Sequence, residues 1–220
     1  MIVLAVLARH EARIIARRGV WPAALVLHAL ATSLFVVLWA PIGGVPLWQA
    51  SVLQQLAALD RLLIAVVLTW LTTFVLASDE SGARDVIEWS AVCGRPARTV
   101  FRARIAAASV MAVVFVAMAV PSFIAAADVS AAPLAELAAD AWSALGFACL
   151  TIGVTAAIRV AVSDRVAIWS IAMAISCAAA LGVRLLDGAA LRAVAPAVAG
   201  AALLAWAPYA VRAWRPFDAD

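Results

Sequence analysis

The sequence predicts an all-α membrane protein that crosses the bilayer six times. Of its 220 residues, 67% are hydrophobic and only 13% are charged, which is too few polar side chains to cover a water-exposed surface. The apolar residues form six long runs, and a helix needs roughly 20 such residues to cross the hydrocarbon core. The basic residues, all of them arginine, gather at the ends of these runs, as in membrane proteins generally. We therefore expect a single transmembrane domain, 1–220.

The second apolar run is short for a span, so its helix is expected to begin earlier, near Ser51. Asp60 and Arg61 would then mark the outer edge of its apolar part. His28 is the one ionisable residue deep in a span. Because its own span contains no acid, a neutral, hydrogen-bonded histidine is favoured over a proton relay or ligand. The six runs place the spans at about 20–40, 62–77, 105–127, 141–158, 166–183 and 193–211.

Residues 1–19 are expected to form an amphipathic helix that lies in the lipid headgroup layer. Arg9, Arg13 and Arg17 recur every four residues and so share one helical face. On that face they would pair with lipid phosphates. Glu11 interrupts the pattern, because it projects onto the apolar side. A positively charged topology anchor is an equally good interpretation of this segment.

One long polar stretch, 78–104, interrupts the apolar chain between the second and third spans. It contains five of the sixteen arginines and four of the thirteen acids. With the N-terminus on the cytoplasmic side, thirteen arginines fall in inner segments, and only Arg61, Arg184 and Arg192 fall outside. Because cytoplasmic loops carry the excess of basic residues, both termini and the stretch 78–104 are expected in the cytoplasm.

Small residues recur every four positions in the fourth span, at Cys149, Gly153 and Ala157. Such a stripe allows two helices to pack closely in lipid. Cys149 and Cys177 lie inside spans, where a small buried hydrophobe is the usual role of cysteine. Cys93 lies alone in the polar stretch, so the cysteines indicate neither a disulfide framework nor a zinc site.

The sequence contains no recognisable catalytic, cofactor-binding or metal-binding set. A chain without lysine cannot form a phosphate-binding loop ending in Gly-Lys-Ser/Thr, and neither His-Glu-x-x-His nor Gly-x-Ser-x-Gly occurs. Asp187, Gly188 and Arg192 resemble the opening of the CDP-alcohol phosphotransferase motif. The residues that follow contain no acid to hold a metal, so we reject that interpretation.

The arginines also form no continuous basic patch, which argues against a nucleic-acid partner. Transporters driven by protons or sodium normally bury ionisable residues at mid-membrane, and apart from His28 the sequence offers no clear candidate. An uncharged interior would suit a lipid-like or amphipathic cargo. It would also place the energy source of any transport in a partner protein.

Two stretches of the chain, together with its layout, resemble the permease subunits of type-2 ABC exporters. The opening, LARHEARIIARRGVWPAALV, is similar to the interfacial helix of that family, and Glu11 matches a family glutamate. The stretch ESGARDVIEWSAVCGRPARTVFRAR is similar to the coupling helix that inserts into the ATPase subunit. In it, Glu80 and Gly82 resemble the acidic-glycine opening. Glu88 resembles the central glutamate, and Arg98 the closing arginine.

The resemblance implies a soluble ABC ATPase subunit that binds ATP and Mg²⁺, and no cofactor bound by this chain. It also implies a second permease, either another copy or a homologue, with cargo passing between the two near the second and fifth spans. The expected location is the bacterial inner membrane. The residues expected to contact the ATPase are Glu80, Gly82, Arg84, Asp85, Glu88, Trp89, Arg95 and Arg98.

A physical argument also favours docking by the polar stretch. Trp89 would be a buried anchor in a cleft of the partner, and the surrounding charges of both signs would set its orientation. The alternative is a solvated loop whose arginines only fix the topology. Trp89 argues against that alternative, because a solvated loop gains nothing by exposing an indole ring, although the ring could instead rest among lipid headgroups.

Two other functional classes remain open. The chain could be a scaffold that transports nothing and whose spans assemble with another membrane complex. An intramembrane enzyme is disfavoured because the acid and metal sets are missing. In size and layout the chain is also similar to the membrane subunit of the haem exporter of cytochrome c maturation, although no haem-ligating set is evident.

Overall fold

The computed structural model describes residues 2–17, 19–39, 52–76, 97–162, 164–183, 186 and 189–210, and this part of the chain contains helices and turns but no strand. Six of its helices are long and apolar enough to cross a membrane. The expected class, an all-α chain with six helices that can span a membrane, is therefore confirmed.

The second and third spans are each built from more than one element. The second is continuous from α3 through the π-helical turn η1 to α4, and the third consists of α6 followed by α7. The bounds are α1 (Ile2–Arg17), α2 (Val20–Trp39), α3 (Val52–Leu63), η1 (Ile64–Leu68), α4 (Thr69–Leu76), α6 (Ala97–Ala117), α7 (Val120–Val129), α8 (Leu134–Ala161), α9 (Arg165–Gly182) and α10 (Ala189–Ala210).

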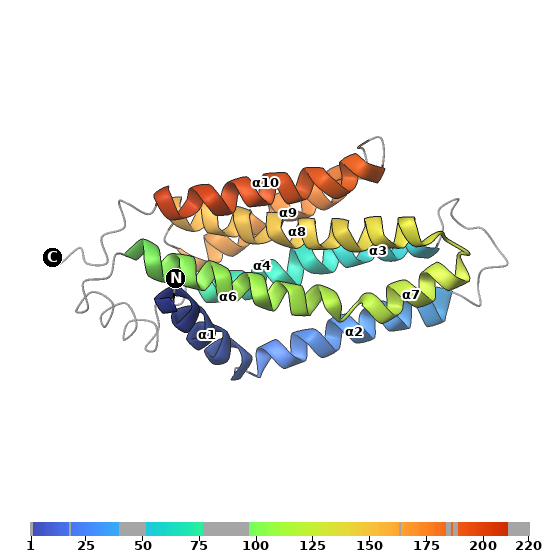
Figure 1. Ribbon diagram of the computed structural model, residues 1–220, viewed down its shortest axis with the longest axis horizontal. Helices are drawn as coiled ribbons and strands as arrows, with labels where there is room; N and C mark the ends of the chain where they lie inside the picture. Colours follow the sequence, from blue (N-terminus) through green and yellow to red (C-terminus); the bar gives the residue numbers. More distant parts are fainter. Residues whose placement is uncertain are drawn as a thin grey trace.

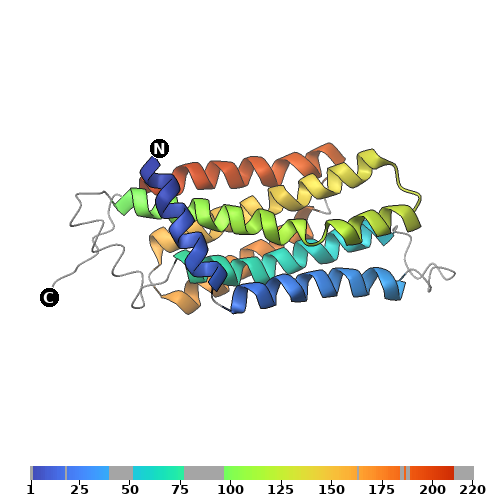
Figure 2. The ribbon, with the colours of Figure 1, turned by 60° about the horizontal axis from the view of Figure 1, so that its bottom comes forward.

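The spans lie side by side along the long axis of the molecule (Figure 1), and α1 crosses them obliquely near one end (Figure 2). The start of α6, the end of α8 and the start of α9 meet at this same end. We call it the arginine-rich end, because arginines of α1, α6, α8 and α9 lie there. The chain enters α3, α8 and α10 from the opposite end.

Three of these helices extend beyond the apolar runs that predicted them. The second span begins at Val52, which agrees with the expected start near Ser51. Residues 97–104, expected to belong to the polar stretch, form the first turns of α6. The fourth span begins at Leu134, so the preceding loop is shorter than expected. Apolar runs stop at the first charges, but helical hydrogen bonding continues through alanine, glutamate and arginine, which are good helix formers.

The third span is broken between α6 and α7. Pro121, in the first turn of α7, has no N–H to donate to the carbonyl four residues earlier. Backbone hydrogen bonds here join residues three apart instead of four. Met118 N–H donates to the Phe115 carbonyl at 3.2 Å, and Ala119 N–H donates to the Val116 carbonyl at 3.1 Å. The Phe115 carbonyl is thereby freed from its usual bond to Ala119 and can accept from another helix.

Glycines bring α8 and α10 into close contact. A Cβ atom added to Gly200 would lie 2.5 Å from Leu150 N and 2.6 Å from the Cys149 carbonyl carbon. One added to Gly153 would lie 2.9 Å from Leu203 Cβ. The close packing expected from the spacing of Cys149 and Gly153 is confirmed, and α10 is the partner helix.

This contact predicts a large effect from one methyl group. We expect Gly200→Ala to lower the free energy of unfolding by about 2 kcal/mol, because the new Cβ meets backbone atoms of α8 that cannot move aside. Gly182→Ala is the matched control, since a Cβ added there meets nothing within 4 Å. Thermal unfolding in detergent compares the two variants, and equal stabilities would contradict the packing.

Candidate functional site: a buried ionisable pair beside a polar cavity

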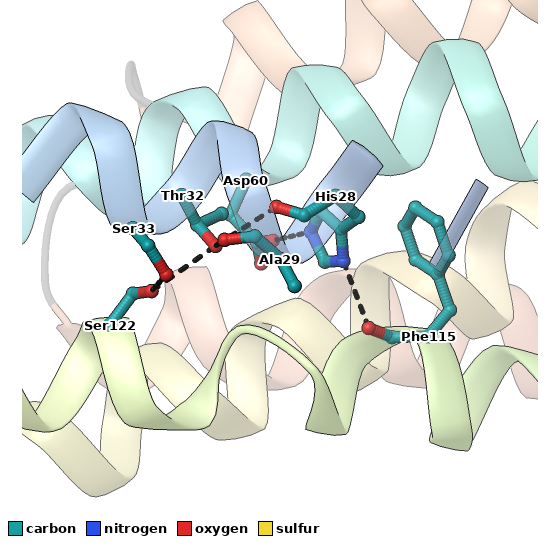
Figure 3. Close-up of polar contacts among 7 residues, drawn as sticks. All are labelled: His28, Ala29, Thr32, Ser33, Asp60, Phe115 and Ser122. Atoms are coloured by element: carbon teal, nitrogen blue, oxygen red, sulfur yellow. Dashed lines mark hydrogen bonds and ion pairs between the residues drawn. The ribbon is translucent and has the colours of Figure 1, made fainter. Parts of the chain in front are cut away.

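A histidine and an aspartate from two spans meet inside the bundle (Figure 3). His28 Nε2 lies 2.7 Å from Asp60 Oδ1, and the two side chains are 1% and 0% exposed. Each residue lies eight positions after the start of its helix, about 12 Å along α2 or α3. The pair therefore lies about 12 Å from the end of the bundle at which α3 begins, inside the bundle.

The backbone of α6 fixes the orientation of the imidazole ring. His28 Nδ1 donates to the Phe115 carbonyl at 2.9 Å, the group that the break in the third span frees. A carbonyl oxygen only accepts, so Nδ1 carries the hydrogen of this bond. The Phe115 ring also stacks on the imidazole, with centroids 4.0 Å apart and planes inclined by 3°. Pro121 therefore contributes indirectly to the position of His28.

His28 and Asp60 share one proton. Two lone pairs facing each other at 2.7 Å would repel, so a hydrogen lies between Nε2 and Oδ1, either on the ring or on the carboxyl. In both arrangements the pair has no net charge, which suits a site where an unpaired ion would be costly. Among the described residues, Asp60 Oδ2 has no hydrogen-bond partner. Histidine and carboxyl side chains buried in a membrane-spanning bundle are the groups from which proton relays are built.

Hydroxyl groups continue from this pair between α2 and α7 (Figure 3). Thr32 Oγ1 donates to the backbone carbonyl of His28 at 3.0 Å, and Ser122 Oγ donates to Thr32 Oγ1 at 3.2 Å. Ser33 Oγ lies 3.1 Å from Ser122 Oγ. Thr32 contacts the backbone of His28 rather than its ring, so this line does not reach the shared proton. Its role is to hold α2 against α7.

A cavity of about 640 Å³ lies between α3, α8 and the start of α10. Arg61, the residue next to Asp60, lines it, so adjacent positions of α3 contribute to the buried pair and to the cavity. Phe35, Leu59 and Leu62 contribute apolar surface. The polar lining consists of Gln54, Gln55, Arg61, Glu136, Asp140, Ser143 and Arg192.

Charges of both signs line this cavity. Arg61 is 7% exposed, and its Nη1 donates to Ser143 Oγ at 3.3 Å. Ser143 Oγ in turn donates to the backbone carbonyl of Arg192 at 3.3 Å, which joins α3, α8 and α10 at the cavity wall. The carboxyl group of Asp140 interacts electrostatically with the positive charges of Arg61 and Arg192 and with the negative charge of Glu136. The cavity therefore contains two guanidinium groups and two carboxyl groups.

The prediction that Asp60 and Arg61 mark the outer edge of the second span is wrong. Both are buried, with 0% and 7% exposure, because the helix begins at Val52 and carries them inside the bundle. The expectation of an uncharged interior is also wrong. The acid that His28 lacks in its own span comes from the neighbouring span. The burial of Asp60 could have been predicted from the expected helix start near Ser51, since that start places Asp60 more than two turns inside the helix.

The arginines of α1 and its glutamate face in different directions, as the sequence predicted. Arg9, Arg13 and Arg17 are exposed, whereas Glu11 is buried with its Oε1 3.9 Å from Arg104 Nε of α6. The sequence did not reveal this partner, because Arg104 falls in the polar stretch 78–104, which is expected to contact a partner protein. The placement of α1 in the headgroup layer stays a prediction.

Most of the expected ATPase contacts lie outside the described residues. Arg98 is in the first turn of α6, where the description of the chain resumes. Its assignment and those of the others stay predictions. The residues outside the described ranges are Glu80, Gly82, Arg84, Asp85, Glu88, Trp89 and Arg95.

In the described part of the chain, no group of three or more His, Cys, Asp or Glu side chains is placed to hold a metal ion. Comparisons of the chain with protein-family models, curated proteins and solved structures gave no match.

Proposed function

We propose that this chain is the membrane-spanning permease subunit of an ATP-driven ABC exporter. It would form the translocation path with a second permease, either another copy or a homologue. The work would come from a soluble ATPase subunit that binds ATP and Mg²⁺, so the chain itself would not be an enzyme. The observation that carries the proposal is the open, charged cavity of about 640 Å³ between membrane-spanning helices.

Such a cavity favours transport over the scaffold interpretation. Helices that only assemble with another complex can bury apolar and small residues, and ionisable groups within a span are costly. This chain nevertheless directs Arg61 and Asp140 toward a space large enough for a small solute or a lipid headgroup. Polar groups around such a space are typical of a substrate pathway.

Two polar contacts support coupling through the stretch 78–104, because they tie both of its borders to the bundle. Arg159 Nε of α8 donates to the Leu76 carbonyl at 3.3 Å, at the last described residue of the second span. On the other border, Arg104 lies against Glu11 of α1. A displacement of the stretch by a partner would therefore be transmitted to α8 and α1. The arginine distribution supports a cytoplasmic placement of the arginine-rich end.

Substitutions in the polar stretch test the coupling. We expect Trp89→Ala and Glu88→Lys each to reduce the stimulation of the partner ATPase by this chain by about tenfold or more, as the loss of a central interface anchor does. Stimulation is measured as phosphate release in co-reconstituted nanodiscs. Trp142→Ala is the matched control, because Trp142 is an exposed tryptophan in the first half of α8, outside the polar stretch. Full stimulation by both loop variants would remove the stretch from the mechanism.

A second candidate, a proton-coupled carrier, is favoured by the pair of His28 and Asp60, which is buried between membrane-spanning helices. The two candidates differ in their energy source. Substrate uptake by liposomes that contain this chain alone, driven by an imposed proton gradient and abolished by His28→Leu, would establish the carrier. Uptake that requires the ATPase and ATP, with no response to the gradient, would exclude it.

A further inference from the structure

We propose that α3 and α7 move together as one outer unit, hinged at irregular turns in the second and third spans, and that His28 of α2 latches this unit to the bundle. The inference rests on the proposed function in one respect, because α3 forms a wall of the cavity assigned to the translocation path. Four features of the fold support it: the two irregular turns, a division of the apolar core, the polar contacts of α2 and the cavities beside α8.

The second and third spans each contain an irregular turn where the outer unit joins the rest of the bundle. In the second span, the π-helical turn η1 directly follows α3. In the third span, the break at 118–119 directly precedes α7. π-Helical turns and interruptions of the helical hydrogen bonding are the usual places at which helices kink, and hinges lie at the ends of helices. Each helix of the outer unit therefore ends at a point that can bend.

α3 and α7 are attached to each other. Leu53 and Leu56 of α3 share an apolar cluster with Phe123 and Ala126 of α7. The Leu53 N–H also donates to Ser130 Oγ at 3.3 Å, which joins the start of α3 to the end of α7. Among the described residues, the largest apolar cluster draws on η1, α4, α6, α8 and α9 but on neither α3 nor α7. The core is therefore divided at the same level as the two irregular turns.

α2 contacts both helices of the outer unit through polar groups (Figure 3). His28 Nε2 lies 2.7 Å from Asp60 Oδ1 of α3, and Thr32 Oγ1 accepts from Ser122 Oγ of α7 at 3.2 Å. His28 also donates to the Phe115 carbonyl, so α2 bonds to the third span on both sides of its break. Hydrogen bonds are directional, whereas the hydrophobic effect is not. The polar contacts, with the pair of His28 and Asp60 at their centre, therefore fix the position of the outer unit.

Two cavities lie between the outer unit and the first half of α8. The charged cavity of about 640 Å³ has Ala57 and Leu59 of α3 in its lining. An apolar cavity of about 370 Å³ lies beside α7 and is lined in part by Phe123, Ile124 and Leu137. Closely interdigitated side chains resist displacement, so these spaces leave α3 and α7 freer to move than the rest of the bundle. A swing of the outer unit would narrow or widen the charged cavity and so act as a gate.

Distances between spin labels test the proposal on the purified chain in nanodiscs, without ATP or a partner. The three native cysteines are replaced by serine, and labels at Asp128→Cys of α7 and Leu191→Cys of α10, both exposed positions, report the position of the outer unit. Asp60→Leu removes the contact with His28 from the α3 side. We expect it to raise the population of a second distance about tenfold, as the loss of one buried hydrogen bond allows.

This readout distinguishes a moving unit from a local disturbance, because the substitution is on α3 and the label is on α7. The label pair Val110→Cys and Leu191→Cys is the matched control, since Val110 is exposed on α6 before the break. Its distance is expected to stay the same in Asp60→Leu. A single, unchanged distance for the α7 pair, or equal broadening of both pairs, would overturn the proposal.

A second variant decides the question if Asp60→Leu does not fold. Ser122→Ala removes only the hydroxyl through which α7 contacts Thr32 and Ser33, and we expect it to raise the population of the same second distance about threefold. No second distance in this variant would contradict the latch. Because no ATPase is present, a failure of this experiment leaves the exporter proposal intact, and a failure of ATPase coupling leaves the hinge intact.

Discussion

Replacing His28 by leucine is expected to destabilise the folded chain by about 3–5 kcal/mol, because it leaves Asp60 buried without a partner. Asp60→Leu has a smaller expected effect, about 2 kcal/mol, since His28 keeps its bond to the Phe115 carbonyl and loses only the acceptor or donor at Nε2. Unfolding by sodium dodecyl sulfate in mixed micelles, followed by circular dichroism, measures both values.

The double variant His28→Leu/Asp60→Leu provides the internal control for this prediction. Replacing both members of a buried polar pair by apolar residues removes the unpaired group, so the double variant is expected to be more stable than His28→Leu alone. Asp128→Leu, at an exposed position of α7, is expected to change the stability by less than about 0.5 kcal/mol. Additive losses in the double variant would contradict the shared-proton geometry.

Reversing the charge of Glu11 is expected to release α1 from α6. Glu11→Lys would place two cations about 4 Å apart at a buried contact, where Arg104 is 2% exposed. We expect the contact to weaken by about 3 kcal/mol, which corresponds to roughly 100-fold faster hydrogen exchange of the α1 amides. Mass spectrometry of the protein in nanodiscs measures this exchange.

A neighbouring residue provides the control for the α1 prediction. Arg13 lies on the exposed face of α1, so Arg13→Ala removes a charge from the same helix without affecting the contact with α6. Exchange of the α1 amides in this variant is expected to match that of the unmodified protein. If Glu11→Lys also left the exchange unchanged, Glu11 would have no part in holding α1 against the bundle.

The number of spans could be predicted from the sequence because each depends on a local run of apolar residues. The helix ends could not be placed by the same rule, because α6 and α8 continue through Arg102, Arg104, Glu136 and Asp140. Hydropathy measures the side chains, whereas a helix ends where its backbone hydrogen bonding ends. The cavity depends on the extension of α8, which supplies Glu136 and Asp140, and could therefore not be predicted from hydropathy.

The pairing of His28 with Asp60 is a second feature that the sequence alone did not reveal. It joins residues 32 positions apart, on two helices whose register depends on packing. The contact of His28 with the Phe115 carbonyl, 87 positions later in the chain, also depends on the break that precedes Pro121. The span of His28 contains no acid, but antiparallel packing brings the acid from a neighbouring span.

The most direct test of the exporter proposal is to identify what co-purifies with this chain when it is extracted gently from its native membrane. Quantitative mass spectrometry of the extract is expected to find an ABC ATPase at a stoichiometric level, and to find it lost from the Trp89→Ala variant but retained with Trp142→Ala. A different membrane complex in stoichiometric amount, or no ATPase under conditions that preserve other ABC transporters, would contradict the proposal.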